Sequence, residues 1–92
     1  MRTIERSSAF RKDIQKVPRE IQAEVFSTVQ KLLIDPFDET MQVRKLADFK
    51  KVFRVKIKKD YRLVYTFDEK FLYLIRFAHR KDIYKLEYNL DF

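Results

Sequence analysis

VFRVKIKKDYRLVYTFDEKFLYLIRFA, residues 52–78, is the stretch that decides the fold. In its first part, 52–58, apolar and cationic side chains alternate, which is the period of a β-strand with one buried face. The alternation returns in 61–67, and 71–78 is apolar nearly throughout, which predicts a central strand. The short polar segments between these runs have the length of tight turns. We therefore expect three consecutive strands joined by two hairpins.

The residues before this stretch follow a helical period instead. Ser7 or Ser8 can cap a short helix, because a serine hydroxyl accepts hydrogen bonds from the free N–H groups of a first turn. The apolar residues of this helix are Phe10, Ile14 and Val17. Pro18 opens a second helix over 18–34, and the Asp-Pro pair at 35–36 ends it. The apolar stripe of the second helix is Ile21, Val25, Val29, Leu32 and Leu33.

The expected order of elements is β-α-α-β-β-β. Residues 2–6 fit a short edge strand, and 79–88 fit either a helical turn or a last extended segment. We predict one α+β domain over 1–92, with the helical hairpin packed on one face of a small, mainly antiparallel sheet. Cysteine and glycine are absent and there is one histidine, which excludes disulfides, glycine-rich phosphate loops and multi-histidine zinc sites. We expect no cofactor and no metal. Without a long apolar run or a leader-like N-terminus, we also expect a cytoplasmic protein with no membrane contact.

The positive charge is concentrated in one segment. The formal net charge is +7, and residues 44–62 hold nine basic and two acidic side chains, so 9 − 2 accounts for all of it. The rest of the chain is balanced. Such a patch attracts a polyanion, and nucleic acid is the commonest one in the cytoplasm. The alternative is a solvated basic surface without a dedicated partner.

The alternation also predicts how these cations are arranged. If the helices cover the apolar side of 52–58, the opposite face presents the cations of this strand. Those cations are Arg54, Lys56 and Lys58. Arg62 lies near them if the next strand pairs as a hairpin, and the third strand ends at His79 and Arg80, four residues before Tyr84. An open cationic face with an aromatic ring at its rim suits a single RNA strand, because cations hold phosphates and the ring stacks on a base.

The run from 52 to 86 resembles the RelE/ParE superfamily of small bacterial and archaeal toxins. Three pieces carry the resemblance: a strand ending in basic residues, then DYRLVY, then HRKDIY. The front half is also similar, with a short strand, S-x-x-F-x-K-D-I, a proline and a long helix. The resemblance therefore extends over nearly the whole chain, and it implies the RelE-like fold.

The resemblance implies a toxin of a type II toxin–antitoxin pair. RelE-like members cut messenger RNA in the ribosomal A site and so inhibit translation, which makes ribosome and messenger expected partners. An acidic, RelB-like antitoxin neutralises them, so we expect a hetero-oligomer with the antitoxin and a monomer when free. ParE-like members share the fold, lack the nuclease residues and inhibit DNA gyrase. A third possibility is a generic RNA-binding module.

The resemblance also implies which residues of this chain form the site. The residues that match catalytic or substrate positions of RelE-like members are Arg54, Lys56, Arg62, His79, Arg80 and Tyr84. Tyr84 matches the tyrosine that stacks on a substrate base. The remaining cations of the patch are expected to bind phosphate or ribosomal RNA, namely Arg44, Lys45, Lys50, Lys51, Lys58 and Lys59.

Cleavage without a metal uses the 2′-hydroxyl of the RNA as nucleophile on the adjacent phosphate. The reaction needs a base, cations for the charge on the phosphorane and an acid for the leaving oxygen. Repulsion by neighbouring cations favours a neutral lysine, so Lys56 is the candidate base, and Arg54 is better suited to clamp phosphate. Arg62 would stabilise the transition state. The acid is His79 or Arg80, and an unperturbed histidine has the better pKa for proton transfer near neutrality.

Each of these residues also has a purely structural interpretation. The cations of 52–58 can be the solvated face of a strand, and Arg62 can be a structural ion-pair partner. A lone His79 can be structural, and Tyr84 can belong to the core, because its neighbours Ile83 and Leu86 also favour burial.

Overall fold

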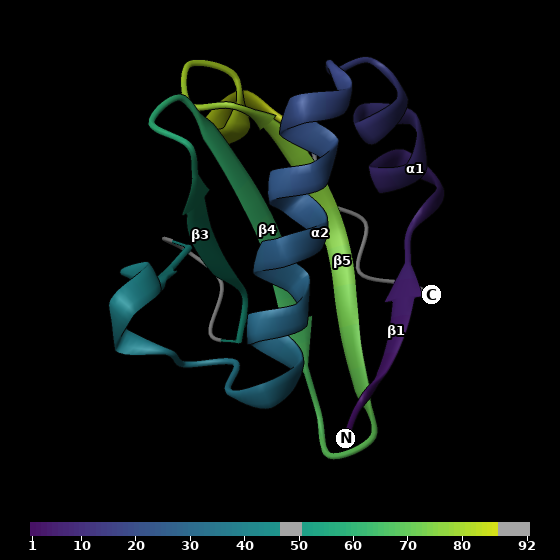
Figure 1. Cartoon of the computed structure of the whole chain (residues 1–92), viewed down its shortest axis with the longest axis vertical. Coiled ribbons are helices and arrows are strands. Elements are labelled where there is room, and N and C mark those ends of the chain that lie inside the picture. Colours follow the sequence, from purple (N-terminus) through teal and green to yellow (C-terminus); the bar gives the residue numbers. More distant parts are fainter. Residues whose placement is uncertain (47–50, 87–92) are drawn as a thin grey trace.

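Two helices lie against one face of a five-stranded sheet (Figure 1). The computed structural model describes residues 1–46 and 51–86. The helices are α1 (Ser8–Gln15) and α2 (Arg19–Ile34), and the short 3-10 helices are η1 (Glu39–Met41) and η2 (Ile83–Lys85). The strands are β1 (Thr3–Arg6), β2 (Arg44–Lys45), β3 (Phe53–Ile57), β4 (Tyr61–Phe67) and β5 (Phe71–His79). Within the part of the chain that the structure describes, no helix is long and apolar enough to span a bilayer.

The sheet has the order β1-β5-β4-β3-β2. β1 runs parallel to β5, and every other neighbouring pair is antiparallel. β5 therefore lies inside the sheet, as its apolar sequence predicts. The α+β architecture, with a helical hairpin on one face of a mainly antiparallel sheet, is confirmed.

The main core lies between the helices and the sheet. Val55 and Ile57 of β3 are buried together with Val29 and Leu32 of α2. In Figure 1, α2 crosses in front of the sheet while α1 lies beside β1 and β5. The apolar side of β3 therefore faces the helices, as the alternation predicts, and its cationic side faces away.

Both helices begin close to their expected positions. The Ser7 hydroxyl accepts a hydrogen bond from the Phe10 amide at 2.9 Å, which caps α1, and it donates to the Ile75 carbonyl at 2.5 Å. One serine thus caps the helix and ties it to β5. α2 begins at Arg19, one residue after the expected start, and Pro18 is its N-cap residue.

Two elements were not expected from the sequence. β2 has two residues, which is too short for a periodic signal, and it pairs with β3. η1 is a single turn whose N-cap residue, Asp38, accepts hydrogen bonds from the backbone and hydroxyl of Thr40. The segment after β5, which the sequence left ambiguous, contains the helical turn η2.

The face of the sheet away from the helices carries a second, smaller apolar cluster. Its buried members are Leu46, Val52, Val64, Ile75 and Ile83. Ile83 is fully buried and anchors η2 to the sheet. The expectation of a wholly open cationic face is therefore wrong, because apolar side chains cover part of it.

The β3–β4 turn departs from the expected geometry. Lys58 has a φ of 52°, in the left-handed region that favours glycine, and this chain has no glycine to place there. Its ammonium lies 3.6 Å from the Glu24 carboxylate of α2. The prediction that Lys58 shares a face with Arg54 and Lys56 is therefore wrong, because the turn directs Lys58 toward the helical layer.

Asp68 organises the β4–β5 turn. Its carboxylate accepts hydrogen bonds from the amides of Phe71 at 2.7 Å and Lys70 at 2.8 Å, and from the Tyr73 hydroxyl at 2.9 Å. The two backbone bonds, Phe71 first, hold the pKa of this carboxyl below its usual value. A lowered carboxyl pKa stabilises the fold above the unfolded-state value of about 3.9, and this stability is lost as the pH falls through the folded-state value.

Asp68→Asn is therefore expected to lower the thermal midpoint at pH 7 and to weaken the loss of stability during acidification below about pH 4. Thermal melts between pH 7 and pH 2 measure both effects. Glu69→Gln is the matched control, since it removes a neighbouring charge without touching these hydrogen bonds. Melts of Asp68→Asn that coincide with those of the wild type at every pH contradict the prediction.

Candidate functional site

Cations face one another across three neighbouring strands. The register pairs Arg44 of β2 with Arg54 of β3, and Lys56 of β3 with Arg62 of β4. Directly opposed residues of antiparallel strands share a face, with Cβ atoms about 5 Å apart. These four side chains, here called the cationic face, therefore lie together on the side of the sheet away from the helices.

Among the residues that the structure describes, no carboxylate forms an ion pair with the cationic face. The ion pairs of residues 1–46 and 51–86 are Lys58–Glu24, Arg76–Asp13 and Arg80–Asp60, and none includes a member of the cationic face. Opposed like charges destabilise a sheet when no anion lies between them. The arrangement therefore favours a ligand that carries several negative charges.

Arg62 is the buried member of the cationic face. Its residue is only 9% exposed, and its Nη1 donates to the Tyr61 carbonyl at 2.9 Å and to the Lys59 carbonyl at 3.1 Å. Its contacts are thus backbone carbonyls of the β3–β4 turn rather than the carboxylate of a structural ion pair. A guanidinium is a rigid, planar fork with five N–H donors, so holding one of its nitrogens fixes the orientation of the whole group.

Tyr84 lies at the rim of the cationic face. It is 58% exposed, and the Arg54 guanidinium carbon lies 5.9 Å from the centre of its ring. The preceding residue, Ile83, is fully buried. The interpretation of Tyr84 as a core residue is therefore wrong: η2 buries Ile83 and presents the tyrosine to solvent next to a cation.

Arg80 begins the segment that follows β5. Its amide donates to the Asp60 carbonyl at 2.7 Å, and its Nε lies 3.8 Å from the Asp60 carboxylate. Both side chains of this ion pair are about half exposed, so the pair is worth little and a competing anion can replace it.

His79 lies on the opposite side of the sheet from Lys56 and Arg62. The register pairs His79 with Tyr61, and the two rings meet edge to face at 5.8 Å. Tyr61 in turn stacks on Phe77 of the main core, with the centroids 5.3 Å apart. The structure therefore separates His79 from the cationic face, although both belong to the same predicted site.

The other predicted phosphate-binding residues are dispersed. Lys45 pairs with Phe53 and so occupies the helical side, and Lys51 and Lys59 are exposed in turns. Lys58 lies near Glu24. Lys50 lies outside the described residues. Of the five that the structure describes, only Arg44 lies on the cationic face.

Arg76 is not among the site residues predicted from the sequence, and the register places it opposite Val64, on the side of the cationic face. The Asp13 carboxylate of α1 accepts from its Nε at 2.8 Å and its Nη2 at 3.0 Å, and also from the Phe77 amide at 3.0 Å. Asp13 thereby attaches α1 to β5. The available signal was that Arg76 is the one charged residue in the otherwise apolar run 71–78.

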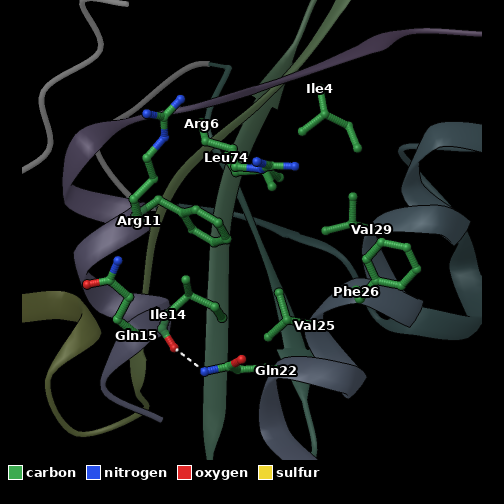
Figure 2. A pocket seen from close by; sticks show the side chains of 11 residues that line it. Ile4, Arg6, Arg11, Ile14, Gln15, Gln22, Val25, Phe26, Val29 and Leu74 are labelled. Carbon is green, nitrogen blue, oxygen red and sulfur yellow. Dashed lines mark hydrogen bonds between the residues drawn. The ribbon is translucent and has the colours of Figure 1, made fainter. Parts of the chain in front are cut away.

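A groove opens on the helical side, between α1, α2 and β1 (Figure 2). Its volume is about 330 Å³. Apolar side chains form most of its wall, and Figure 2 shows Arg6 and Arg11 toward one end of it. At the other end the Gln22 side chain joins the helices by donating to the carbonyls of Ile14 at 3.0 Å and Val17 at 3.1 Å. Phe26 is 67% exposed beside the groove, which is unusual for so large an apolar side chain.

The family model described as the ParE toxin of the type II toxin–antitoxin system parDE matches residues 4–84. No curated protein matches significantly.

Several solved structures share the fold. A chain of the Escherichia coli DinJ–YafQ toxin–antitoxin complex superimposes with a TM-score of 0.74 at 19% identity, covering 90% of this chain and 97% of that one. The RelB–RelE antitoxin–toxin complex of Methanococcus jannaschii gives 0.72 at 19% identity, covering 89% and 96%. The RelBE2 toxin–antitoxin complex of Mycobacterium tuberculosis gives 0.71 at 24% identity, covering 86% and 98%.

Proposed function

We propose a function from one premise: the chain belongs to the ParE toxin family of type II toxin–antitoxin systems. We propose that this toxin is a metal-independent endoribonuclease that cuts messenger RNA in the ribosomal A site and so stops translation. The observation that carries the proposal is the cationic face with Tyr84 exposed beside it. Closely spaced cations beside a solvent-exposed aromatic ring suit an RNA strand, because the cations can bind its phosphates while the ring stacks on a base.

The proposed reaction assigns one task to each group. Lys56 accepts the proton of the substrate 2′-hydroxyl, whose oxygen then bonds to the adjacent phosphorus. Arg54 and Arg62 hold the phosphate oxygens as the charge of the phosphorane develops. The bond from phosphorus to the 5′-oxygen breaks, leaving a 2′,3′-cyclic phosphate, and the departing oxygen takes a proton from solvent water to give a free 5′-hydroxyl end. Arg80 lies at the end of the neighbouring strand and stabilises the departing oxygen.

The Tyr84 ring is proposed to stack on a base of the substrate. Tyr84→Ala is expected to weaken binding of ribosome-bound messenger by about 1–3 kcal/mol, the usual loss for one stacked base. Tyr84→Phe keeps the ring and is expected to bind like the wild type. Because Tyr84 is 58% exposed, both variants should retain the wild-type thermal transition. Equal binding by the alanine and phenylalanine variants would remove Tyr84 from the site.

A translation reaction tests the proposed function directly. Purified toxin is added to a cell-free system, and ribosome-bound messenger is mapped for new ends in the A-site codon. We expect arrest together with new 5′-hydroxyl ends, and loss of both in Lys56→Ala. Arrest without any new RNA end would overturn the assignment.

Gyrase inhibition is the second candidate, and the family match itself favours it, because the matching model is that of the ParE toxin. In the superfamily that the sequence resembles, ParE-like members inhibit gyrase and are not nucleases. A DNA supercoiling assay on the same preparation distinguishes the two. Inhibited supercoiling with normal translation would select gyrase.

The proposed partner is an acidic antitoxin. The solved complexes named above pair a toxin of this fold with an antitoxin such as RelB or DinJ. In this chain the groove of Figure 2 offers an apolar floor with Arg6 and Arg11 at its edge, which suits an amphipathic helix whose acidic side meets the arginines. The cationic face offers the same partner a second, purely electrostatic contact.

Phe26→Asp is expected to weaken antitoxin binding at least about tenfold, because it places a carboxylate beside the apolar groove without disturbing the core. Ile34→Asp is the matched control, since Ile34 is 78% exposed on the same helix and does not line the groove. Titration calorimetry with the antitoxin encoded beside the toxin gene measures both. Equal affinity of the two variants would exclude the groove.

A further inference from the structure

His79 is tied into the turn that follows β5. Its Nδ1 accepts a hydrogen bond from the Lys81 amide at 3.1 Å, and its carbonyl accepts one from the Asp82 amide at 2.9 Å. A side-chain acceptor that binds the amide two residues later is the pattern of an Asx turn, here made by a histidine ring. The turn leads directly into η2, which buries Ile83 and exposes Tyr84.

We propose that His79 is a positioning residue, not the general acid: as a neutral ring with its proton on Nε2, it fixes the turn that follows Arg80 and places Tyr84 beside the cationic face. The expected effect of His79 on the cleavage rate rests on the proposed nuclease function, whereas the protonation of its ring is inferred from geometry alone.

The hydrogen bond determines which ring nitrogen carries the proton. A backbone amide is always a donor, so the Nδ1 that accepts from Lys81 has no proton. A histidine acting as general acid starts as the imidazolium, with protons on both nitrogens. In the imidazolium form, the Nδ1–H of His79 would face the N–H of Lys81, so the hydrogen bond that holds the turn would be lost.

The position of the His79 ring also argues against a role as general acid. His79 lies beside Tyr61 on the helical side of the sheet, whereas Lys56 and Arg62 lie on the other side. A proton donor must come within hydrogen-bond reach of the departing oxygen. The ring instead borders a hollow of about 430 Å³ between α1 and the end of β5. The charged groups that line this hollow are Asp13, Lys16, Arg76, Asp82 and Lys85.

Nuclear magnetic resonance tests the state of the ring without using activity. His79 is the one histidine of the chain, so its ring nitrogens give an unambiguous signal in long-range ¹H–¹⁵N spectra. We expect the Nε2–H form at pH 7.5, with Nδ1 unprotonated. An Nδ1–H form or an imidazolium at that pH would overturn the inference, whether or not the protein cuts RNA.

Two variants test the effect on the reaction. His79→Asn places an amide oxygen where Nδ1 lies and can accept from Lys81, whereas the side chain of His79→Gln is one carbon too long for this turn. Both variants lose the ring contact with Tyr61 equally, so the difference between them reports the hydrogen bond. We expect cleavage by His79→Asn within about threefold of the wild type, and by His79→Gln about tenfold slower, which is the size of one lost hydrogen bond.

A catalytic acid would give a different result. Both variants would then lose about 10²-fold to 10⁴-fold. The wild-type rate would also fall as the pH rises past the ordinary histidine range of about 6.5. A folded His79→Asn as slow as His79→Gln, or that fall in rate, overturns the inference. Absence of RNA cleavage in the wild type would instead refute the proposed function and leave the spectroscopic test in force.

Discussion

Val55→Asp is expected to unfold the protein in buffer at 25 °C. Val55 of β3 is fully buried in the main core, between the sheet and the helices. The change removes the favourable burial of an apolar side chain, about 1.5–3 kcal/mol, and buries a carboxylate without a partner, which costs several kcal/mol more. A domain of this length has roughly 5–15 kcal/mol of total stability, so the two losses together are comparable to all of it. Far-ultraviolet circular dichroism and a thermal scan check the prediction.

Lys56→Asp is the control for Val55→Asp. It introduces the same carboxylate one residue later in β3, where the side chain is exposed on the other face of the sheet. We expect this variant to fold, since a solvated carboxylate among cations carries no burial cost. A cooperative transition for Val55→Asp near that of Lys56→Asp would show that the core is not where the alternation and the structure place it.

The strands could be predicted because their signals are local. Alternation in 52–58 and 61–67 identifies both the strands and the faces that they bury, and the structure has these strands as β3 and β4. β2 has two residues and forms only because β3 offers it a free edge, so no window of sequence contains its signal. Which strands are neighbours in the sheet is likewise a tertiary property.

The second apolar cluster was missed for a related reason. Val64 lies in a strand whose other outward residues are polar, so it is interpreted as exposed. Its burial depends on Leu46 and Ile83, which are far from it in sequence and carry no periodic signal of their own. Spacing therefore identifies the faces of a strand, but not which segments return to cover them.

The candidate site could be predicted as a set of residues but not as a geometry. Arg54, Lys56 and Arg62 share a face because strand alternation requires it, and the register confirms that they do. Lys58 does not lie on that face, because it adopts the left-handed backbone conformation in the β3–β4 turn and its side chain points elsewhere. His79 lies on the other side of the sheet because it pairs with Tyr61. This pairing depends on the register between two strands, which the sequence of one strand does not determine.

The triple variant Lys56→Ala, Arg62→Ala, Arg80→Ala is expected to abolish RNA cleavage and growth arrest, with a loss of at least about 10³-fold in rate. Removing one electrostatic stabiliser of a transition state costs about 10²–10³-fold, and groups that act as a unit are not additive, so the combined loss exceeds the single one. The assay is the mapping of cut messenger on ribosomes, with growth arrest measured in parallel. A thermal transition must first confirm folding, because Arg62 is a buried residue that bonds the β3–β4 turn.

The cations could act through their total charge or as a specific site, and a second triple variant distinguishes these two explanations. Lys12→Ala, Lys31→Ala, Lys70→Ala also lowers the net charge from +7 to +4, but its lysines lie on α1, on α2 and in the β4–β5 turn. If the cations merely attract a polyanion, both triple variants weaken alike; if they form a site, only the first loses cleavage. A folded first variant that cuts at the wild-type rate refutes the nuclease assignment. One that still arrests growth without cutting RNA transfers the activity to gyrase, because the same fold would then act through a surface that does not need these three residues.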